Sequence, residues 1–190
     1  AYLQYEILPG FSAKISGSLK VIDNDIKNFN VKEPEPGKPN LVNGLTMFRA
    51  INIGWIGEGF LYYDKSFQRH KINAMMGFSA MKNTGEDLSA SKSGFDFEYP
   101  TFQYLNAGTF NPVCYGGYGE DGLVSGLLRL NYSYADKYIV ALNMRADGSS
   151  KFAKGNRWGY FPSFSAAWRM TQEKFMNNIS WLDDLKLRVS

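Results

Sequence analysis

The stretch that decides the fold is RLNYSYADKYIVALNMRADGSSKF, residues 129–152, in which polar and apolar side chains alternate almost throughout. A two-residue alternation is typical of a β-strand, because successive side chains point to opposite faces of the sheet. Arg129, Asn131, Asn143 and Arg145 lie on the polar side of this pattern. Periodicity alone leaves open whether the apolar side touches a protein core or membrane hydrocarbon.

The same alternation recurs along the chain and predicts an all-β protein. Aromatic residues make up 16% of the sequence and its 19 glycines are spread along the chain, a mixture that favours β-structure. We expect eight strands. They cover residues 1–7, 11–22, 48–63, 67–82, 125–134, 138–147, 162–171 and 185–190.

The predicted connections alternate between tight and long. The tight ones are residues 8–10, 64–66 and 135–137, and the long ones are residues 23–47, 83–124 and 148–161. Short turns on one side and long loops on the other are typical of an outer-membrane barrel. Residues 172–184 break the rule with a medium-length connection, in which we expect a short helical turn. Whether residues 23–47 and 83–124 contain further strands stays open.

Composition excludes several other classes of protein. A net charge of +3, without a run of basic residues, gives no support to nucleic-acid binding. A single cysteine, Cys114, and a single histidine, His70, cannot supply a cluster of metal ligands. The sequence marks no catalytic nucleophile or acid–base pair, and it lacks an apolar run long enough for a transmembrane helix. We therefore predict no enzyme, no cofactor and no metal site.

The two faces of the predicted strands have different partners. Tyrosines bracket the tight turns, where their rings and polar tips suit the boundary between lipid and water. The residues that we expect to face lipid or form this aromatic girdle are Leu128, Leu130, Tyr132, Tyr134, Tyr138, Val140, Leu142 and Trp168. The cations that we expect to face a hydrated lumen are Lys14, Lys20, Arg129, Arg145, Arg169 and Arg188. The alternative hypothesis is a soluble β-sandwich that binds carbohydrate, in which the same leucines pack in a dry core.

One long predicted loop is rich in aromatic rings. Residues 95–119 carry eight of them, and exposed rings stack on sugars or on a partner protein. We expect contact with a lid protein or a ligand from the first five of these rings. They are Phe95, Phe97, Tyr99, Phe102 and Tyr104.

The C-terminal third of the chain carries a series of segments that together resemble one family. They are RLNYSYADKY (129–138), RADGSSKF (145–152), NRWGYFPSFSAAWR (156–169), EKFM (173–176) and LKLR (185–188). In this order they are similar to the barrel of the SusC/RagA family, the TonB-linked outer-membrane transporters of Bacteroidota. The earlier half of the chain matches less closely, mainly in pattern.

The resemblance implies a specific architecture and set of partners. It implies that residues 1–190 form an antiparallel transmembrane β-barrel segment, about eight strands of a plugged barrel of about 22. The plug and the N-terminal part that contacts TonB are expected outside this stretch. Family members reside in the bacterial outer membrane and import bulky oligosaccharides or peptides together with a SusD-like surface lipoprotein. Outer-membrane lipid is then the expected partner of the apolar face.

Overall fold

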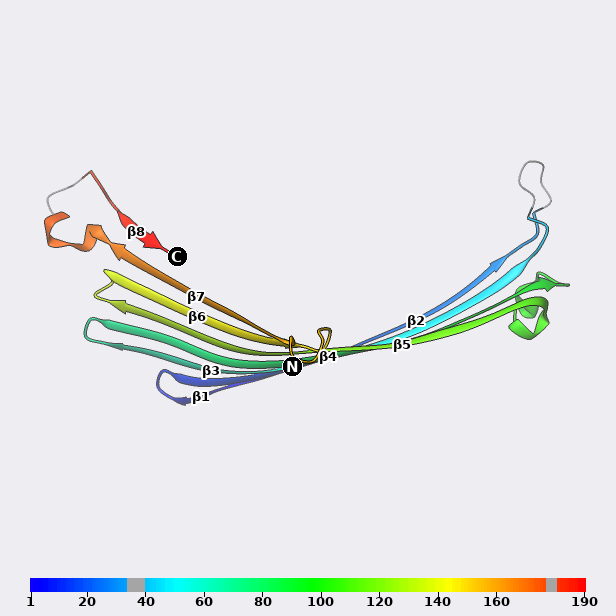
Figure 1. Cartoon of the computed structure of the whole chain (residues 1–190), viewed down its shortest axis with the longest axis horizontal. Coiled ribbons are helices and arrows are strands. Elements are labelled where there is room, and N and C mark those ends of the chain that lie inside the picture. The colour runs from blue at the N-terminus through cyan, green and yellow to red at the C-terminus, as the bar shows by residue number, and fades with distance from the viewer. Residues whose placement is uncertain (34–39, 177–180) are drawn as a thin grey trace. The chain divides into compact units, whose positions relative to one another are not determined.

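The computed structural model describes residues 1–33, 40–176 and 181–190. All strands in these ranges form one antiparallel sheet of eight strands, ordered as they follow one another in the chain (Figure 1). They are β1 (Tyr2–Leu8), β2 (Phe11–Asn30), β3 (Gly44–Phe67), β4 (His70–Phe95), β5 (Gly108–Tyr134), β6 (Tyr138–Ser149), β7 (Trp158–Arg169) and β8 (Lys186–Val189). The predicted all-β class and the eight strands are confirmed. A β-sandwich needs two facing sheets, so the soluble alternative is wrong.

The tight turn between β5 and β6 lies where the sequence predicts it. Tyr134 pairs with Tyr138, and residues 135–137 form the turn between them. Ala135 and Asp136 both adopt positive φ angles, of 53° and 56°. The Ala135 N–H donates a 2.6 Å hydrogen bond to the carbonyl of Arg69, so this turn is tied to the neighbouring one.

The turn between β3 and β4 lies further along the chain than predicted. Residues 64–66 are part of β3, and the turn falls at residues 68–69, where Gln68 has a φ of 53°. The polar residues suggested a turn, but Asp64 uses its carboxylate within the sheet, where it accepts a hydrogen bond from the Asn73 amide. A polar run inside a strand therefore caused the misplacement.

Much of the two longest predicted connections is strand. β2 extends to Asn30 and β4 to Phe95, while β3 begins at Gly44 and β5 at Gly108. Within the described part of residues 23–47 and 83–124, the flanking strands lengthen and no separate strand is added. The prediction of long connections there was wrong, because these strand segments are rich in polar residues and glycine and lack the strict alternation that marks a strand in the sequence.

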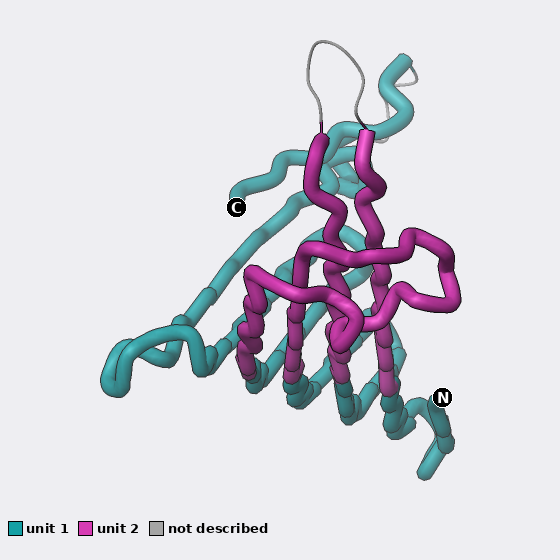
Figure 2. Tube along the Cα trace, turned by 90° about the vertical axis from the view of Figure 1, so that its right-hand side faces the viewer, with its two compact units in different colours: residues 1–18, 55–82, 121–190 teal, residues 19–54, 83–120 magenta. Residues whose placement is uncertain are grey.

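The chain divides into two compact units, and each unit combines stretches that are distant in sequence (Figure 2). Unit 1 comprises residues 1–18, 55–82 and 121–190, and unit 2 comprises residues 19–54 and 83–120. Among the described residues, the buried hydrophobic side chains are Leu45, Ala50 and Phe95. All three belong to unit 2, so none of the described hydrophobic side chains of unit 1 is fully buried.

The connection after β7 contains short helical turns, as expected. These are two 3₁₀ turns, Met170–Gln172 and Lys174–Met176. The predicted connection at residues 172–184 also includes residues 177–180, which lie outside the described residues. In the described ranges, no helix has the length and apolar character needed to cross a membrane.

Gly10 is the glycine on which the β1–β2 turn depends. It has a φ of +80°, and a Cβ atom added there would lie 2.1 Å from the carbonyl oxygen of Asp64. The Asp64 N–H donates to the Gly10 carbonyl at 2.7 Å, which fixes this close approach of two backbones. A side chain at this position would force the turn away from β3.

We expect Gly10→Ala to destabilise the barrel of the full-length protein by about 2 kcal/mol or more, since the conformation costs about 1–3 kcal/mol for a residue with a Cβ and the clash adds to it. Urea unfolding in detergent micelles measures the change. Gly57→Ala is the matched control, because a Cβ there meets nothing within 4 Å. Equal stability of the two variants would contradict this account of the turn.

Candidate functional site

The predicted lipid-facing residues of β5, β6 and β7 lie on one face of the sheet. Residues directly opposite one another in an antiparallel pair share a face. The opposing pairs on this face are Leu128–Met144, Leu130–Leu142, Tyr132–Val140 and Tyr134–Tyr138 between β5 and β6, and Tyr138–Trp168, Val140–Ala166 and Leu142–Phe164 between β6 and β7. The register therefore joins all eight predicted residues into one continuous apolar face.

This apolar face is not covered by other parts of the described chain. Leu128 is 51% exposed, Leu142 is 47% exposed and Phe164 is 56% exposed. Large side chains exposed side by side over several strands are unfavourable in water, because each buried Å² of apolar surface is worth about 25 cal/mol. The face therefore requires an apolar environment outside this chain.

The opposite face carries a network of polar hydrogen bonds between strands. Arg129 Nε donates to Asn143 Oδ1 at 2.9 Å, and Asn143 Nδ2 donates to Ser163 Oγ at 3.3 Å, which links β5, β6 and β7. Asn131 Nδ2 donates to Asn73 Oδ1 at 3.3 Å, which extends the network to β4. These hydrogen bonds thus link four strands along the face where the sequence predicts a lumen.

The six predicted lumen-facing cations are not gathered at one point. Arg129 and Arg145 lie on the polar face of β5 and β6, and Arg145 binds Asp147 at 2.7 Å. In the pairing of β7 with β8, Arg188 lies opposite Ala167, which is two residues from Arg169 on β7. Arg169 and Arg188 therefore lie on the same face of the sheet. Lys14 in unit 1 holds its ammonium 5.0 Å from the ring centre of Tyr2. Lys20 is exposed on β2 within unit 2.

An aromatic cluster occupies the tight-turn end of the apolar face. The rings of Tyr134 and Tyr138 stack with centroids 6.5 Å apart. His70 Nδ1 lies 2.7 Å from the hydroxyl of Tyr132, and the His70 ring stacks on Phe67 at 4.9 Å. The predicted girdle residues Tyr132, Tyr134 and Tyr138 therefore lie together in one cluster. His70 was missed as a member of this cluster, although its position next to a turn and on the apolar side is a usable signal.

Glu173 organises the polar edge of this cluster. Its carboxylate accepts hydrogen bonds from the Tyr138 hydroxyl at 2.8 Å, from Lys137 Nζ at 3.0 Å and from Trp168 Nε1 at 3.3 Å. These hydrogen bonds, that of Tyr138 first, lower the pKa of Glu173 below its usual value, so the carboxylate is ionised at neutral pH. The sequence offered no sign of this role beyond its place in the segment EKFM.

In unit 2, Asn43 fastens the aromatic segment that follows β4. Asn43 is fully buried, its Nδ2 donates to the Phe95 carbonyl at 2.8 Å, and its Oδ1 accepts from the Phe95 N–H at 2.7 Å. Nδ2 also donates to Glu98 at 3.0 Å, and the Lys32 N–H donates to the same carboxylate at 2.8 Å. The hydrogen bonds from Lys32 and Asn43 lower the pKa of Glu98. We call Asn43, Phe95 and Glu98 the latch.

Phe95 differs from the role expected of it. It is 1% exposed and packs edge-on against Phe29 at 5.2 Å, so its ring is not available to stack on a ligand or lid. It is buried because it ends β4 beside Gly108, whose missing side chain leaves room for the ring. Phe95 therefore anchors the segment instead of making the external contact.

The other four predicted rings are exposed around two 3₁₀ turns, Pro100–Phe102 and Leu105–Ala107. Tyr99 is 70% exposed and Phe97 is 56% exposed, and the ring of Phe97 lies 5.1 Å from that of Phe102. Tyr104 is also exposed. We call Phe97, Tyr99, Phe102 and Tyr104 the aromatic platform.

Comparisons with known proteins agree with this geometry. No protein-family model matches the chain. TonB-dependent receptor P3 of Formosa agariphila is 32% identical over 192 residues, covering 100% of this chain and 19% of the receptor. TonB-dependent receptor SusC of Bacteroides thetaiotaomicron is 34% identical over 134 residues, covering 68% of this chain and 12% of SusC. The chain thus spans about a fifth or less of the length of these relatives.

The solved structures show the same fold. The RagAB peptide transporter matches with a TM-score of 0.85 at 20% identity, over 98% of this chain and 21% of the RagAB chain. The eight-stranded antiparallel sheet matches part of the barrel of this transporter, which defines the class as part of an outer-membrane β-barrel. The chain belongs to the SusC/RagA-like TonB-dependent receptors, a family of bacterial outer-membrane transporters and not of enzymes.

We expect Asn43→Ala to release the aromatic segment, because the Phe95 N–H and carbonyl lose their buried partners at a cost of about 2–4 kcal/mol. Hydrogen exchange on the full-length receptor measures the effect as faster exchange of the Phe95 amide, by about tenfold or more. Asn24→Ala, at an exposed position of β2, is the control. Unchanged protection of Phe95 in Asn43→Ala would show that the latch does not hold the segment.

Proposed function

We propose that all of residues 1–190 form part of the barrel wall of a TonB-dependent importer of bulky nutrients, oligosaccharides or peptides. The observation that carries the proposal is that one sheet has an exposed apolar face and an opposite face cross-linked by polar hydrogen bonds. Such a sheet fits hydrocarbon on one side and water on the other. The plug and the segment that contacts TonB then belong to other parts of the receptor.

In this proposal the six lumen-facing cations line a hydrated passage. Arg129 Nε donates to the neutral amide of Asn143 at 2.9 Å, and Arg145 Nε donates to the carboxylate of Asp147 at 2.7 Å. Paired side chains of this kind make a solvated wall with weak net attraction for anions. The passage is therefore suited to polar, uncharged oligomers as well as to peptides.

The aromatic cluster sets the depth of the apolar face in the membrane. Tyr134, Tyr138 and Trp168 mark one boundary between lipid and water. Leu142 lies four positions beyond Tyr138, which is about 13 Å along a strand and about 10 Å of depth at a tilt of about 40°. Because the apolar band is about 25 Å tall, Leu142 lies near its middle.

We expect Leu142→Arg to destabilise the full-length barrel by about 2–4 kcal/mol, since an arginine near the bilayer midplane must leave water. Ser163→Arg is the matched control, because Ser163 is exposed on the polar face, where it accepts a hydrogen bond from Asn143. Reversible folding into phospholipid vesicles measures both changes. Equal losses in the two variants would refute the assignment of the faces.

The aromatic platform is proposed as a contact for a SusD-like surface lipoprotein that closes the barrel. Exposed tyrosine and phenylalanine rings are favoured at protein interfaces. The latch holds the platform in place before binding, which reduces the entropy lost on association. Tyr99, at 70% exposure, is the ring with the most surface to bury.

We expect the double variant Phe97→Ala, Tyr99→Ala of the full-length receptor to bind the purified lipoprotein about tenfold or more weakly, because two interface rings are removed. Biolayer interferometry in detergent measures this. Phe175→Ala, which removes a ring that is 61% exposed at the tight-turn end, is the control. If lipoprotein affinity were unchanged but nutrient uptake were impaired, the platform would contact the nutrient instead of the lipoprotein. If neither lipoprotein affinity nor nutrient uptake changed, the proposed role of the platform would be wrong.

A further inference from the structure

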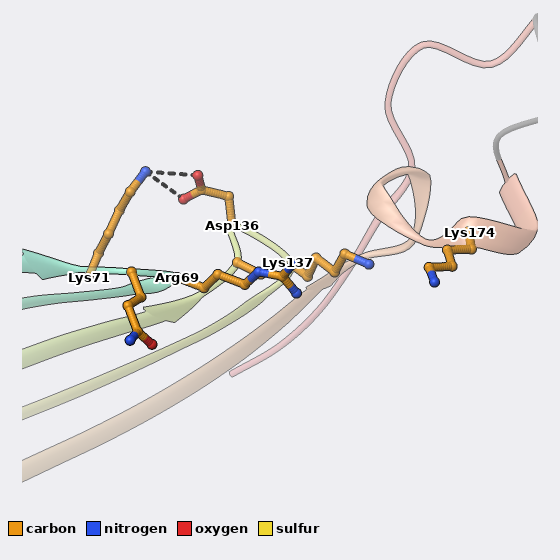
Figure 3. A pocket seen from close by; sticks show the side chains of 7 residues that line it. Arg69, Lys71, Asp136, Lys137 and Lys174 are labelled. Carbon is orange, nitrogen blue, oxygen red and sulfur yellow. Dashed lines mark hydrogen bonds and ion pairs between the residues drawn. The ribbon is translucent and has the colours of Figure 1, made fainter.

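A shallow pocket of about 420 Å³ lies at the tight-turn end of unit 1 (Figure 3). It is formed where the β3–β4 turn, the β5–β6 turn and the 3₁₀ turn after β7 come together. Its lining residues are Gln68, Arg69, Lys71, Ala135, Asp136, Lys137 and Lys174. Four of these side chains are cationic and one is acidic, which makes the pocket strongly basic.

The internal ion pairs leave part of this positive charge uncompensated. Lys71 Nζ lies 2.8 Å from both carboxylate oxygens of Asp136 (Figure 3). Lys137 Nζ lies 3.0 Å from the carboxylate of Glu173. Arg69 and Lys174 are exposed, and within the described ranges neither has an acidic partner. An anion entering the pocket would therefore gain from two cations without displacing an existing pair.

The position of the pocket indicates where such an anion comes from. The turn residues Ala135–Lys137 lie directly between Tyr134 and Tyr138, which belong to the aromatic cluster. Aromatic belts lie at the level of the lipid headgroups. The turn residues lie one to three positions beyond the aromatic belt, which is within about 10 Å of it. Phospholipid phosphates are found at this depth.

We propose that this pocket binds the phosphate group of an anionic phospholipid. Arg69 suits a phosphate because its planar guanidinium offers two parallel N–H donors, and Lys174 adds a point charge from the other side of the pocket. Asp136 limits the affinity because it occupies Lys71 and repels the anion. The lipid source of the phosphate depends on the proposed membrane orientation of the sheet, whereas the recognition of phosphate depends only on the pocket.

The test is a titration of the purified full-length receptor in neutral detergent with phosphatidylglycerol, followed by native mass spectrometry. We expect the double variant Arg69→Gln, Lys174→Gln to bind about tenfold or more weakly, because both unpaired cations of the pocket are removed. Lys151→Gln, Lys154→Gln removes the same charge from the β6–β7 connection and should bind like the native receptor. Asp136→Asn should bind several-fold more tightly, a gain that misfolding does not produce.

Two further arms identify the source of the phosphate. Phosphatidylcholine, whose phosphate is neutralised by its own headgroup, should bind less tightly than phosphatidylglycerol, and inorganic phosphate should compete only at high concentration. Equal binding by the native receptor and the Arg69, Lys174 variant would overturn the site. Inorganic phosphate binding as tightly as the lipid would overturn the lipid assignment. The Leu142→Arg experiment does not involve the pocket, so a failure here and a failure of the membrane assignment are distinguishable.

Discussion

The structure depends on one constraint: a strand that crosses hydrocarbon must satisfy its backbone hydrogen bonds within the sheet. β5 and β6 do this over an unbroken register that begins at Leu123–Ser149 and ends at Tyr134–Tyr138. Once the backbone is paired, each strand has only its two side-chain faces to adapt to the surroundings. The alternation of apolar and polar residues is the direct result.

The same constraint explains what could be predicted from the sequence. Strict alternation is expected where the two faces meet different solvents. The end of β5, the turn at residues 135–137 and the bounds of β6 were predicted close to their observed positions, whereas β5 begins 17 residues earlier than predicted. The alternation weakens in residues 23–30 and 83–95, and there the prediction stopped although β2 and β4 continue. Asp23 on β2 and Arg49 on β3 show the change, because their 2.9 Å ion pair holds two polar strand segments together. Pairing between strands, which the sequence pattern does not record, sets the true strand length.

The contacts that build the candidate sites were beyond sequence reasoning for a different reason. Lys71 and Asp136 are 65 positions apart, and His70 and Tyr132 are 62 positions apart. In strands of more than 20 residues, such as β4 and β5, a contact between such distant positions can be predicted only when the register of the strands is known. Asn43 meets Phe95 in the same way, across 52 positions. Which of these residues contact each other depends on the lengths of the strands. The pattern of the sequence predicted strands that were too short, so these contacts could not be predicted.

The fully buried hydrophobic side chains are concentrated in one of the two units. Leu45, Ala50 and Phe95, the hydrophobic side chains buried among the described residues, belong to unit 2, whereas Leu142 and Phe164 in unit 1 remain about half exposed. Unit 2 does not enclose all of its apolar side chains, because Leu19, Ile26 and Leu88 are 69%, 54% and 55% exposed. The latch buries one ring, that of Phe95, at the point where β4 ends and the aromatic segment begins. The hydrogen bonds of one buried asparagine, and not an extended hydrophobic core, therefore hold this segment in place.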